Sequence, residues 1–362
     1  TLSHQVLYNA SIYKFFDNTP IPDTSYYKQF LVDIRGVRHF LKHKKIENSL
    51  RLSTFKLDKS SRAKNQRDLL ELGLRHSHHI LRQEPRDSIL NNLFAYGKLR
   101  LNLNNKFLLN TYAHLGLWDN AGDFRIEGDL ELDFKKFGNL KISAVNQLYS
   151  PTLIQQRFYV SQRKIWDNDF GKTLESRLSA TYSLPKIQLE VTGSYHLINN
   201  YIYFDTLAVP RQTGLPINIL QLTVKKNFRV GPIHLDNVLS LQNVSESFIR
   251  LPSLYTKNSL YYAGKWFKVL DVKLGFDLRY SDTFFSNYYH PLVGQFILQD
   301  QQEIGNYPSV DAFFSMRVTT FRAFFKWENL TRLANDQLFY PSSFYLYPLN
   351  GFRMGIYWVL KG

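Results

Sequence analysis

The sequence predicts an all-β fold, a transmembrane antiparallel up-and-down β-barrel of about 16 strands. Three observations carry this prediction. Apolar and polar residues alternate over unusually long runs. Short and long connections alternate along the chain. Aromatic residues make up 15% of the composition, with 28 Phe, 23 Tyr and 5 Trp. Because the sequence has no run of 18 apolar residues, the spanning element it predicts is a strand rather than a helix.

The alternation is clearest in two segments. In residues 124–134 the even positions are apolar except for Gly128, and the odd positions are all Arg, Asp or Glu. Residues 270–280 alternate in the same way, with apolar even positions and charged odd positions except for Gly275. Such runs extend over roughly 11–13 residues, whereas strands of soluble proteins average about 5–6. This length suits a tilted strand that crosses a bilayer, with lipid on its apolar side and a wet lumen on its charged side.

Segmentation on this pattern gives sixteen strands, and all 13 prolines fall between them, as central strands require. Residues 29–43 carry charge on both faces and are interpreted as loop; if they and one further segment were strands, the count would be eighteen. The long connections all fall at one end, which predicts that they lie outside and that both termini lie in the periplasm. The expected strands are 2–16, 46–57, 67–83, 91–103, 106–118, 122–135, 139–149, 172–184, 186–199, 217–228, 233–243, 255–266, 268–281, 309–318, 320–331 and 350–361.

The same alternation assigns two sets of side chains. Opposed charges inside a pore tune ion selectivity, and the residues expected to line the lumen are Glu71, Arg75, Arg100, Arg125, Asp129, Glu131, Glu175, Arg177, Asp236, Asp277, Arg279, Arg322, Glu328 and Arg353. Aromatic residues cluster where strands meet the long loops, and Tyr and Trp favour the headgroup level of a membrane. The expected outer aromatic girdle is Tyr201, Tyr203, Phe204, Phe284, Tyr288, Tyr289, Phe339, Tyr340, Tyr345 and Tyr347.

The formal charge is +15, and the surplus is uneven. Residues 35–67 hold eleven Lys and Arg against two acids, a surplus of nine. This stretch either binds the phosphates of lipopolysaccharide or forms a solvated loop and turn. A nucleic-acid partner is not expected, because the basic residues are not interleaved with stacking aromatics. The chain has no cysteine, which excludes disulfides, thiolate metal sites and cysteine nucleophiles.

Five segments are distinctive enough to compare with known families. They are Asn-Asn-Tyr-Ile-Tyr-Phe at 199–204, Ile-Arg-Leu-Pro at 249–252, Ile-Gly-Asn-Tyr-Pro-Ser-Val-Asp-Ala-Phe-Phe at 304–314, Phe-Phe-Lys-Trp-Glu-Asn at 324–329 and the ending Phe-Arg-Met-Gly-Ile-Tyr-Trp at 352–358. These segments resemble the putative porin family of Bacteroidota. The resemblance is strongest from about residue 150 to the C-terminus. It implies an integral protein of the bacterial outer membrane, the barrel portion of a longer protein, and brings no catalytic residues. One departure is that Trp358 is followed by Val-Leu-Lys-Gly, not by a terminal aromatic.

The remaining motifs give weaker signals of a metal site, a catalytic site or a glycosylation site. His76 and His78 share one face of a strand and His79 lies on the other, without the four convergent ligands that zinc needs, so no metal or other cofactor is expected. Ser, His and Asp are frequent, but no Gly-x-Ser-x-Gly elbow occurs, and no catalytic residues are assigned. Asp-Ser-Ile at 87–89 and Asp-Thr-Leu at 205–207 resemble O-glycosylation sites of Bacteroidota, and both are expected in outside loops.

Together these patterns predict a single outer-membrane domain over residues 1–362. Its expected function is a porin-like channel for passive diffusion of small hydrophilic solutes, with a weak anion preference from basic charge at the outer mouth. The alternative is a structural or docking barrel of a larger complex with a plugged lumen, and a barrel enzyme is disfavoured. The expected partners are outer-membrane lipid, lipopolysaccharide and, for the alternative, other outer-membrane proteins or lipoproteins.

Overall fold

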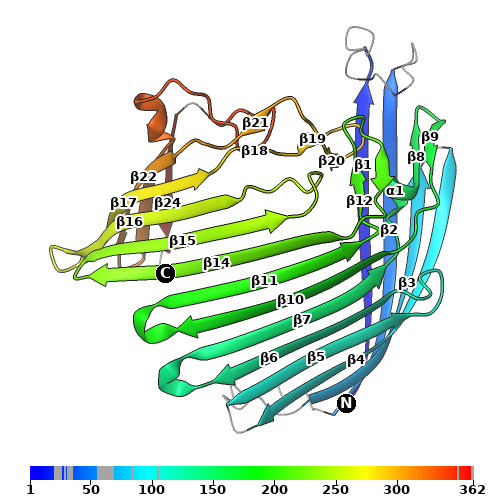
Figure 1. The fold of residues 1–362 in the computed structure, drawn as a ribbon, viewed down its shortest axis with the longest axis horizontal. Coiled ribbons are helices and arrows are strands. Elements are labelled where there is room, and N and C mark those ends of the chain that lie inside the picture. The colour runs from blue at the N-terminus through cyan, green and yellow to red at the C-terminus, as the bar shows by residue number, and fades with distance from the viewer. Residues whose placement is uncertain are drawn as a thin grey trace.

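The computed structural model describes residues 1–19, 27, 30, 36–54, 69–83, 85–103, 106–348 and 350–359. Sixteen strands form one antiparallel sheet in which each strand pairs with its neighbours in chain order (Figure 1). They are β1 (Leu2–Asp17), β2 (Val37–Ser53), β3 (Leu69–Gln83), β4 (Arg86–Leu103), β5 (Phe107–Gly116), β6 (Phe124–Asp133), β7 (Asn139–Tyr149), β10 (Thr173–Leu184), β11 (Leu189–Asn199), β14 (Ile217–Val230), β15 (Ile233–Val244), β16 (Leu254–Trp266), β17 (Leu270–Ser281), β22 (Ser309–Val318), β23 (Phe321–Glu328) and β24 (Gly351–Trp358).

The long connections contain small elements of their own. Four two-stranded ribbons pair β8 with β9, β12 with β13, β18 with β21 and β19 with β20. These elements are α1 (Leu153–Gln156), β8 (Arg157–Val160), β9 (Arg163–Asp167), β12 (Ile202–Phe204), β13 (Pro210–Gln212), β18 (Phe284–Phe285), β19 (Tyr288–His290), β20 (Gln295–Ile297), β21 (Glu303–Ile304) and the 3-10 turn η4 (Leu330–Leu333). The opposite end of the sheet has tight turns, including η2 (Lys135–Phe137) and η3 (Pro185–Ile187).

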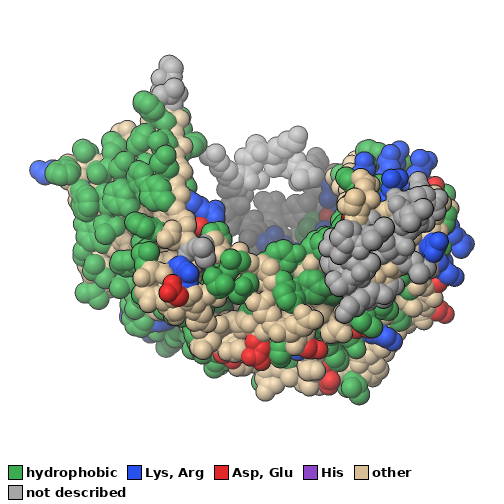
Figure 2. All heavy atoms as spheres, turned by 90° about the horizontal axis from the view of Figure 1, so that it is seen from above, with side chains coloured by type: hydrophobic (Ala, Val, Ile, Leu, Met, Phe, Trp, Pro, Cys, Tyr) green, Lys and Arg blue, Asp and Glu red, His purple; other side chains and the backbone are tan. Residues whose placement is uncertain are grey.

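The sheet curves around a hollow, but its two edges do not meet. Among the described residues β1 pairs only with β2, and β24 pairs only with β23. In Figure 1 the strands sweep from upright β1–β3 on the right to upright β22–β24 on the left, and Figure 2 shows the hollow between these flanks. The predicted up-and-down antiparallel sheet of sixteen strands is therefore confirmed, whereas its closure is not seen. Within the described residues, no helix is both long and apolar enough for a membrane span.

Pairing register explains which side chains share a face. In β10, Leu178 lies opposite Ala144 of β7 and Tyr195 of β11, whereas Ser179 lies opposite Ser143 and Ser194. Because successive side chains point to opposite faces of a strand, apolar residues gather mainly in the rows of one face and polar residues mainly in those of the other. The polar rows form what we call the inner face, toward the hollow. The apolar rows form the outer face, and Figure 2 shows hydrophobic side chains over the outer flank on the side of β22–β24.

The structure corrects two interpretations of the sequence. Residues 37–43 are not loop, because β2 begins at Val37 and pairs with β1 along its whole length. The strand count stays sixteen, since these residues extend a predicted strand and add none. The glycosylation-like motif at 87–89 is not in a loop either, because it lies in β4 and pairs with residues 80–82 of β3. The second such motif does lie in a loop, where Thr206 is exposed.

The alternation of connections predicts the orientation of the sheet in the membrane. A peptide tag inserted at Gly214, in the loop between β13 and β14, should bind antibody on intact cells. A tag at Gly231, in the turn between β14 and β15, should bind only after the outer membrane is permeabilised. Neither glycine has a heavy atom within 4 Å of a built Cβ, so both insertions have room. Antibody binding at Gly231 on intact cells would invert the topology.

Candidate functional site: a charged wall and a loop cluster at one end

The inner face is a wall of paired charges. The Glu71 side chain, 9% exposed, faces Lys98 Nζ at 3.4 Å and Arg51 Nε at 4.0 Å. Arg125 donates to Glu127 and to Gln147, and Lys141 pairs with Asp129 and Glu131. By register, all fourteen residues expected in the lumen lie on this face. Their neighbours satisfy many of them, so much of the wall's charge is balanced locally.

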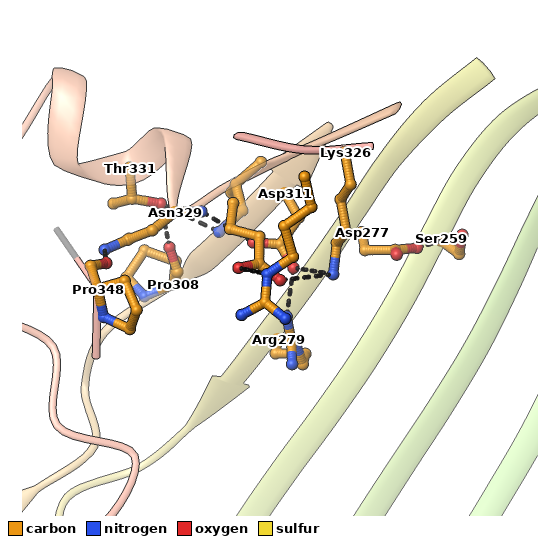
Figure 3. A network of polar contacts seen from close by, with 12 residues as sticks. Ser259, Asp277, Arg279, Pro308, Asp311, Lys326, Asn329, Thr331 and Pro348 are labelled. Atoms are coloured by element: carbon orange, nitrogen blue, oxygen red, sulfur yellow. Dashed lines mark hydrogen bonds and ion pairs between the residues drawn. The ribbon is translucent and has the colours of Figure 1, made fainter. Parts of the chain in front are cut away.

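One network on this wall is centred on a fully buried carboxylate (Figure 3). Asp311 of β22, 0% exposed, pairs with Arg279 of β17 and with Lys326 Nζ of β23 at 2.9 Å. It also accepts a hydrogen bond from the backbone N–H of Asn329 at 2.9 Å. Asp277 lies directly opposite Asp311 in the register and accepts a hydrogen bond from Ser259. Three strands and the loop after β23 thus meet at one carboxylate near the long-loop end.

A second group of charges lies at the short-turn end and is unbalanced. The register aligns Lys265, Asp271, Arg317 and Arg322 in one row across β16, β17, β22 and β23. Asp271 pairs with Arg317 Nη2 at 2.6 Å and with Lys265 Nζ at 4.0 Å, whereas Arg322 has no acidic partner among the described residues. With Lys273, the row lines a groove of about 990 Å³. Four cations against one acid leave this end of the wall basic.

The buried apolar core lies among the loops at the long-loop end of the sheet. A mouth cluster gathers buried residues from four connections: Tyr27, Phe30, Val37, Phe158, Val160, Trp166, Phe204, Ala208, Leu292, Val293 and Ile297. The rings of Phe158 and Trp166 stack at 4.4 Å, and His39 meets Phe158 edge-on at 4.7 Å. His39 is buried and lies 3.2 Å from the backbone oxygen of Tyr159. The cluster fixes the loops against one another at one side of the hollow.

Residues 282–308, here called the strap, cross the long-loop end from β17 and β22 to the opposite flank (Figure 1). At the far side, Tyr13 of β1 donates a hydrogen bond to the backbone oxygen of Pro291. The backbone N–H of Leu298 donates to the backbone oxygen of Phe204 at 3.0 Å. Next to Leu298 in the chain, Gln299 donates to the backbone oxygen of Ser286 at 2.7 Å and to Ser343, in the connection between β23 and β24, at 2.8 Å. The strap is therefore joined to the sheet at one side and docked on β1 and β12 at the other, and it narrows the opening.

A buried histidine makes the docking of the strap sensitive to acid. His290 is 2% exposed, its ring lies 5.7 Å from Phe30, and burial lowers its pKa from 6.5 to about 4. The docked state therefore holds the neutral ring. Above pH 6.5 docking is unaffected, and between pH 6.5 and about 4 an undocked strap takes up the proton more readily. This favours release by up to about 3 kcal/mol at the acid limit.

We expect acid to expose the strap of the otherwise cysteine-free chain. Val293→Cys, a buried position, should react with 4,4′-dithiodipyridine faster at pH 4 than at pH 7, relative to Gly214→Cys as an exposed reference. Adding His290→Gln should reduce this acid response without abolishing it, because His39, which packs edge-on against Phe158 of the mouth cluster, is also buried. A rate ratio that stays constant from pH 7 to pH 4 would show that protonation does not release the strap.

The predicted aromatic girdle is only partly placed toward the surface. Tyr345 is 45% exposed, and Tyr203 stacks on Phe248 at 4.6 Å. Phe204 was expected in the girdle at the membrane surface, but it is 6% exposed and packs against Trp166 in the mouth cluster. Tyr288 also packs against the mouth cluster. These two rings stabilise the loops, because the ribbons that carry them fold inward over the hollow.

The histidines of residues 75–79 do not converge. His76 packs against Trp118, and His78 lies 2.7 Å from Asn91 on the outer face. His79 lies on the inner face, 2.9 Å from His43. Within the described parts of the chain, no three His, Asp or Glu side chains gather into a group that could hold a metal ion.

Sequence reasoning missed several residues of this site. Asp311 and Lys326 lie on the same face as the predicted lumen residues, so the alternation could have included them. Lys273 lies on the charged side of residues 270–280, which the sequence already assigned to the lumen. The burial of His39 and His290 had no local signal, because it depends on loops that are distant in sequence. The mouth cluster and the strap could not be anticipated for the same reason.

Comparison with solved structures gives the same architecture. The chain is similar to the copper transporter OprC (TM-score 0.66, 14% identity, 99% of this chain and 64% of that one). It is also similar to the ferric enterobactin receptor PfeA from Pseudomonas aeruginosa (TM-score 0.64, 11% identity, 98% and 59%). A third is the FrpB iron transporter from Neisseria meningitidis (TM-score 0.62, 10% identity, 98% and 60%). The chain thus spans about three fifths of their length, and at this identity the likeness shows the fold alone. No curated protein matches it in sequence.

The sheet, its two faces and these structures define the fold of an outer-membrane β-barrel. A family model described as "Putative porin" matches residues 1–360. The chain belongs to that family.

Proposed function

We propose that this protein is an outer-membrane channel through which small hydrophilic solutes diffuse passively. The observation that carries the proposal is the inner face, where ion pairs and polar side chains continue from β1 to β24 around the hollow. Such a wall is suited to water and dissolved solutes, whereas the outer face is suited to lipid. The proposal assigns the chain no catalytic role and no cofactor.

The weak anion preference in this proposal has a different origin from the one the sequence suggested. Residues 55–67, part of the basic stretch, lie outside the described residues. The support comes instead from the row containing Arg317 and Arg322. A cationic patch with little local compensation raises the concentration of anions nearby. Because it is exposed to solvent, its effect should fade over a screening length of about 10 Å at 0.1 M salt.

Planar-bilayer recording of the full-length protein tests both parts of the proposal. We expect an open channel whose reversal potential in a KCl gradient shows a weak preference for chloride. Arg322→Gln should reduce that preference, and Lys42→Gln, on the outer face, should leave it unchanged. Strong cation selectivity would contradict the anion preference. Absence of conductance at every voltage would contradict the channel itself.

The alternative function is a structural or docking barrel that binds other outer-membrane proteins or lipoproteins. The strap and the mouth cluster favour it, because they place eleven buried apolar side chains across one end of the hollow. If the wild-type protein does not conduct but co-purifies with a stable partner, this alternative replaces the channel.

A further inference from the structure

Four cations gather on the outer face near the long-loop end of β1–β3. Lys42 of β2 lies opposite Ile12 of β1 and opposite Arg82 of β3. Lys44 lies opposite Ala10 and Ile80, one row further from the loops. Lys14 lies diagonally next to Lys42, because its direct partner is Phe40. We call Lys14, Lys42, Lys44 and Arg82 the basic patch.

The alternation of side chains along the strands places the basic patch on the outer face, away from the hollow. The groove on the inner face of these strands is lined by residues at the alternate strand positions, including Gln5, Glu47 and Glu71. On the face of the patch, the rows toward the short-turn end carry exposed apolar side chains, among them Tyr8 (60%), Val6 (60%) and Leu50 (45%), beside three histidines and Asn48. Figure 2 shows Lys and Arg side chains on the flank at the right, where β1–β3 lie in Figure 1. The patch therefore lies beyond an apolar band on the lipid side.

The charges of the patch are poorly balanced. Lys42 and Arg82 are direct cross-strand neighbours of like charge, an arrangement that destabilises a sheet unless an anion lies between them. The only acid that pairs with the patch in the described structure is Asp87, which lies 3.6 Å from Arg82, and both side chains are about 60% exposed. Lys14, Lys42 and Lys44 make no ion pair among the described residues. A net surplus of three positive charges is left for an external anion.

We propose that the basic patch binds the phosphate groups of lipopolysaccharide in the outer leaflet. Its position supports this ligand, because phosphates of a glycolipid lie at the boundary between acyl chains and water, and the patch lies where charged side chains join the apolar ones toward the long-loop end of the outer face. Its chemistry also fits, since three adjacent strands present ammonium and guanidinium donors to one side, and Arg and Lys are the donors that phosphate oxygens prefer. The nearer rows, which include Tyr8, Ile46 and Val6, would contact the acyl chains of the same molecule.

The test measures binding of fluorescent rough lipopolysaccharide to the purified full-length protein in detergent, without divalent cations. Lys42→Gln with Arg82→Gln should weaken binding at least tenfold. The matched control, Lys257→Gln with Lys273→Gln, removes the same charge from the inner face and should bind like the wild type. Glycolipid stripped of its phosphates should bind the wild type no better than it binds the double variant.

Three results would overturn the proposal. Equal weakening by both double variants would show an effect of net charge alone. Unchanged binding in the Lys42 and Arg82 variant would exclude the patch. Equally strong binding of phosphatidylglycerol, or competition by inorganic phosphate at similar concentration, would show a general anion surface. Because Lys42 and Arg82 lie on the outer face, none of these results bears on conductance, and the channel proposal stands or fails separately.

Discussion

Replacing Leu178 with Arg should destabilise the membrane-inserted protein by about 2–4 kcal/mol, the cost of a lipid-facing Arg near the bilayer midplane. Leu178 lies midway along β10, is 54% exposed and points to the outer face between Ala144 and Tyr195. Urea unfolding of the protein in lipid vesicles, followed by tryptophan fluorescence, would measure this change.

The neighbouring residue supplies a matched control. Ser179 points to the inner face, where Ser143 and Ser194 are its cross-strand neighbours and leave space for a longer side chain. Ser179→Arg should therefore change the unfolding free energy by less than about 0.5 kcal/mol, as surface substitutions usually do. Similar losses in the two variants would show that the two faces of the sheet have been assigned incorrectly.

Replacing Asp311 with Asn should cost about 2–3 kcal/mol of unfolding free energy, because it leaves Arg279 and Lys326 without their shared counterion. This is below the usual cost of breaking a fully buried pair, since the two cations are 37% and 28% exposed and water can partly solvate them. The same urea titration measures the loss. We also expect β22 to exchange its amide hydrogens faster near Ser309.

Asp277→Asn is the control for this prediction. Asp277 lies opposite Asp311, and its one hydrogen bond, from Ser259, can also be accepted by an amide oxygen. Removing its charge relieves repulsion between two carboxylates, so the expected change is within about 0.5 kcal/mol of zero. If Asp277→Asn were as harmful as Asp311→Asn, the ion pairs at Asp311 would not be the source of the stability.

The alternation of side chains predicted most of the sheet because it is a local property. The alternation of side chains alone assigns Arg279 and Glu328 to one face of the sheet. The pairing of the strands keeps both residues on that face. Residues 37–43 were misassigned because this part of β2 lies at the level of the basic patch, where each face mixes apolar residues with charged residues or histidine and the alternation disappears. Closure was not predictable either, since curvature depends on twist and register summed over sixteen strands.

The loops were the least predictable part. Phe204 was assigned to the membrane surface because it follows two tyrosines at a strand end, yet it packs against Trp166 from a different connection. Burial of this kind is decided by partners that lie far away in the chain. The same applies to Asp311, whose value to the structure depends on Lys326 and Asn329 reaching it from the next strand and loop.

The strap imposes an order on assembly. Tyr13 and Pro291, which hold its far end, are 278 residues apart in sequence, and contacts of such separation form slowly because a long stretch of chain must be ordered first. The hydrogen bond between Tyr13 and Pro291 cannot form until β17 and the segment after it have joined the growing sheet. A half-assembled sheet therefore has its hollow fully open on the side of the long loops, and only the arrival of the last strands narrows it.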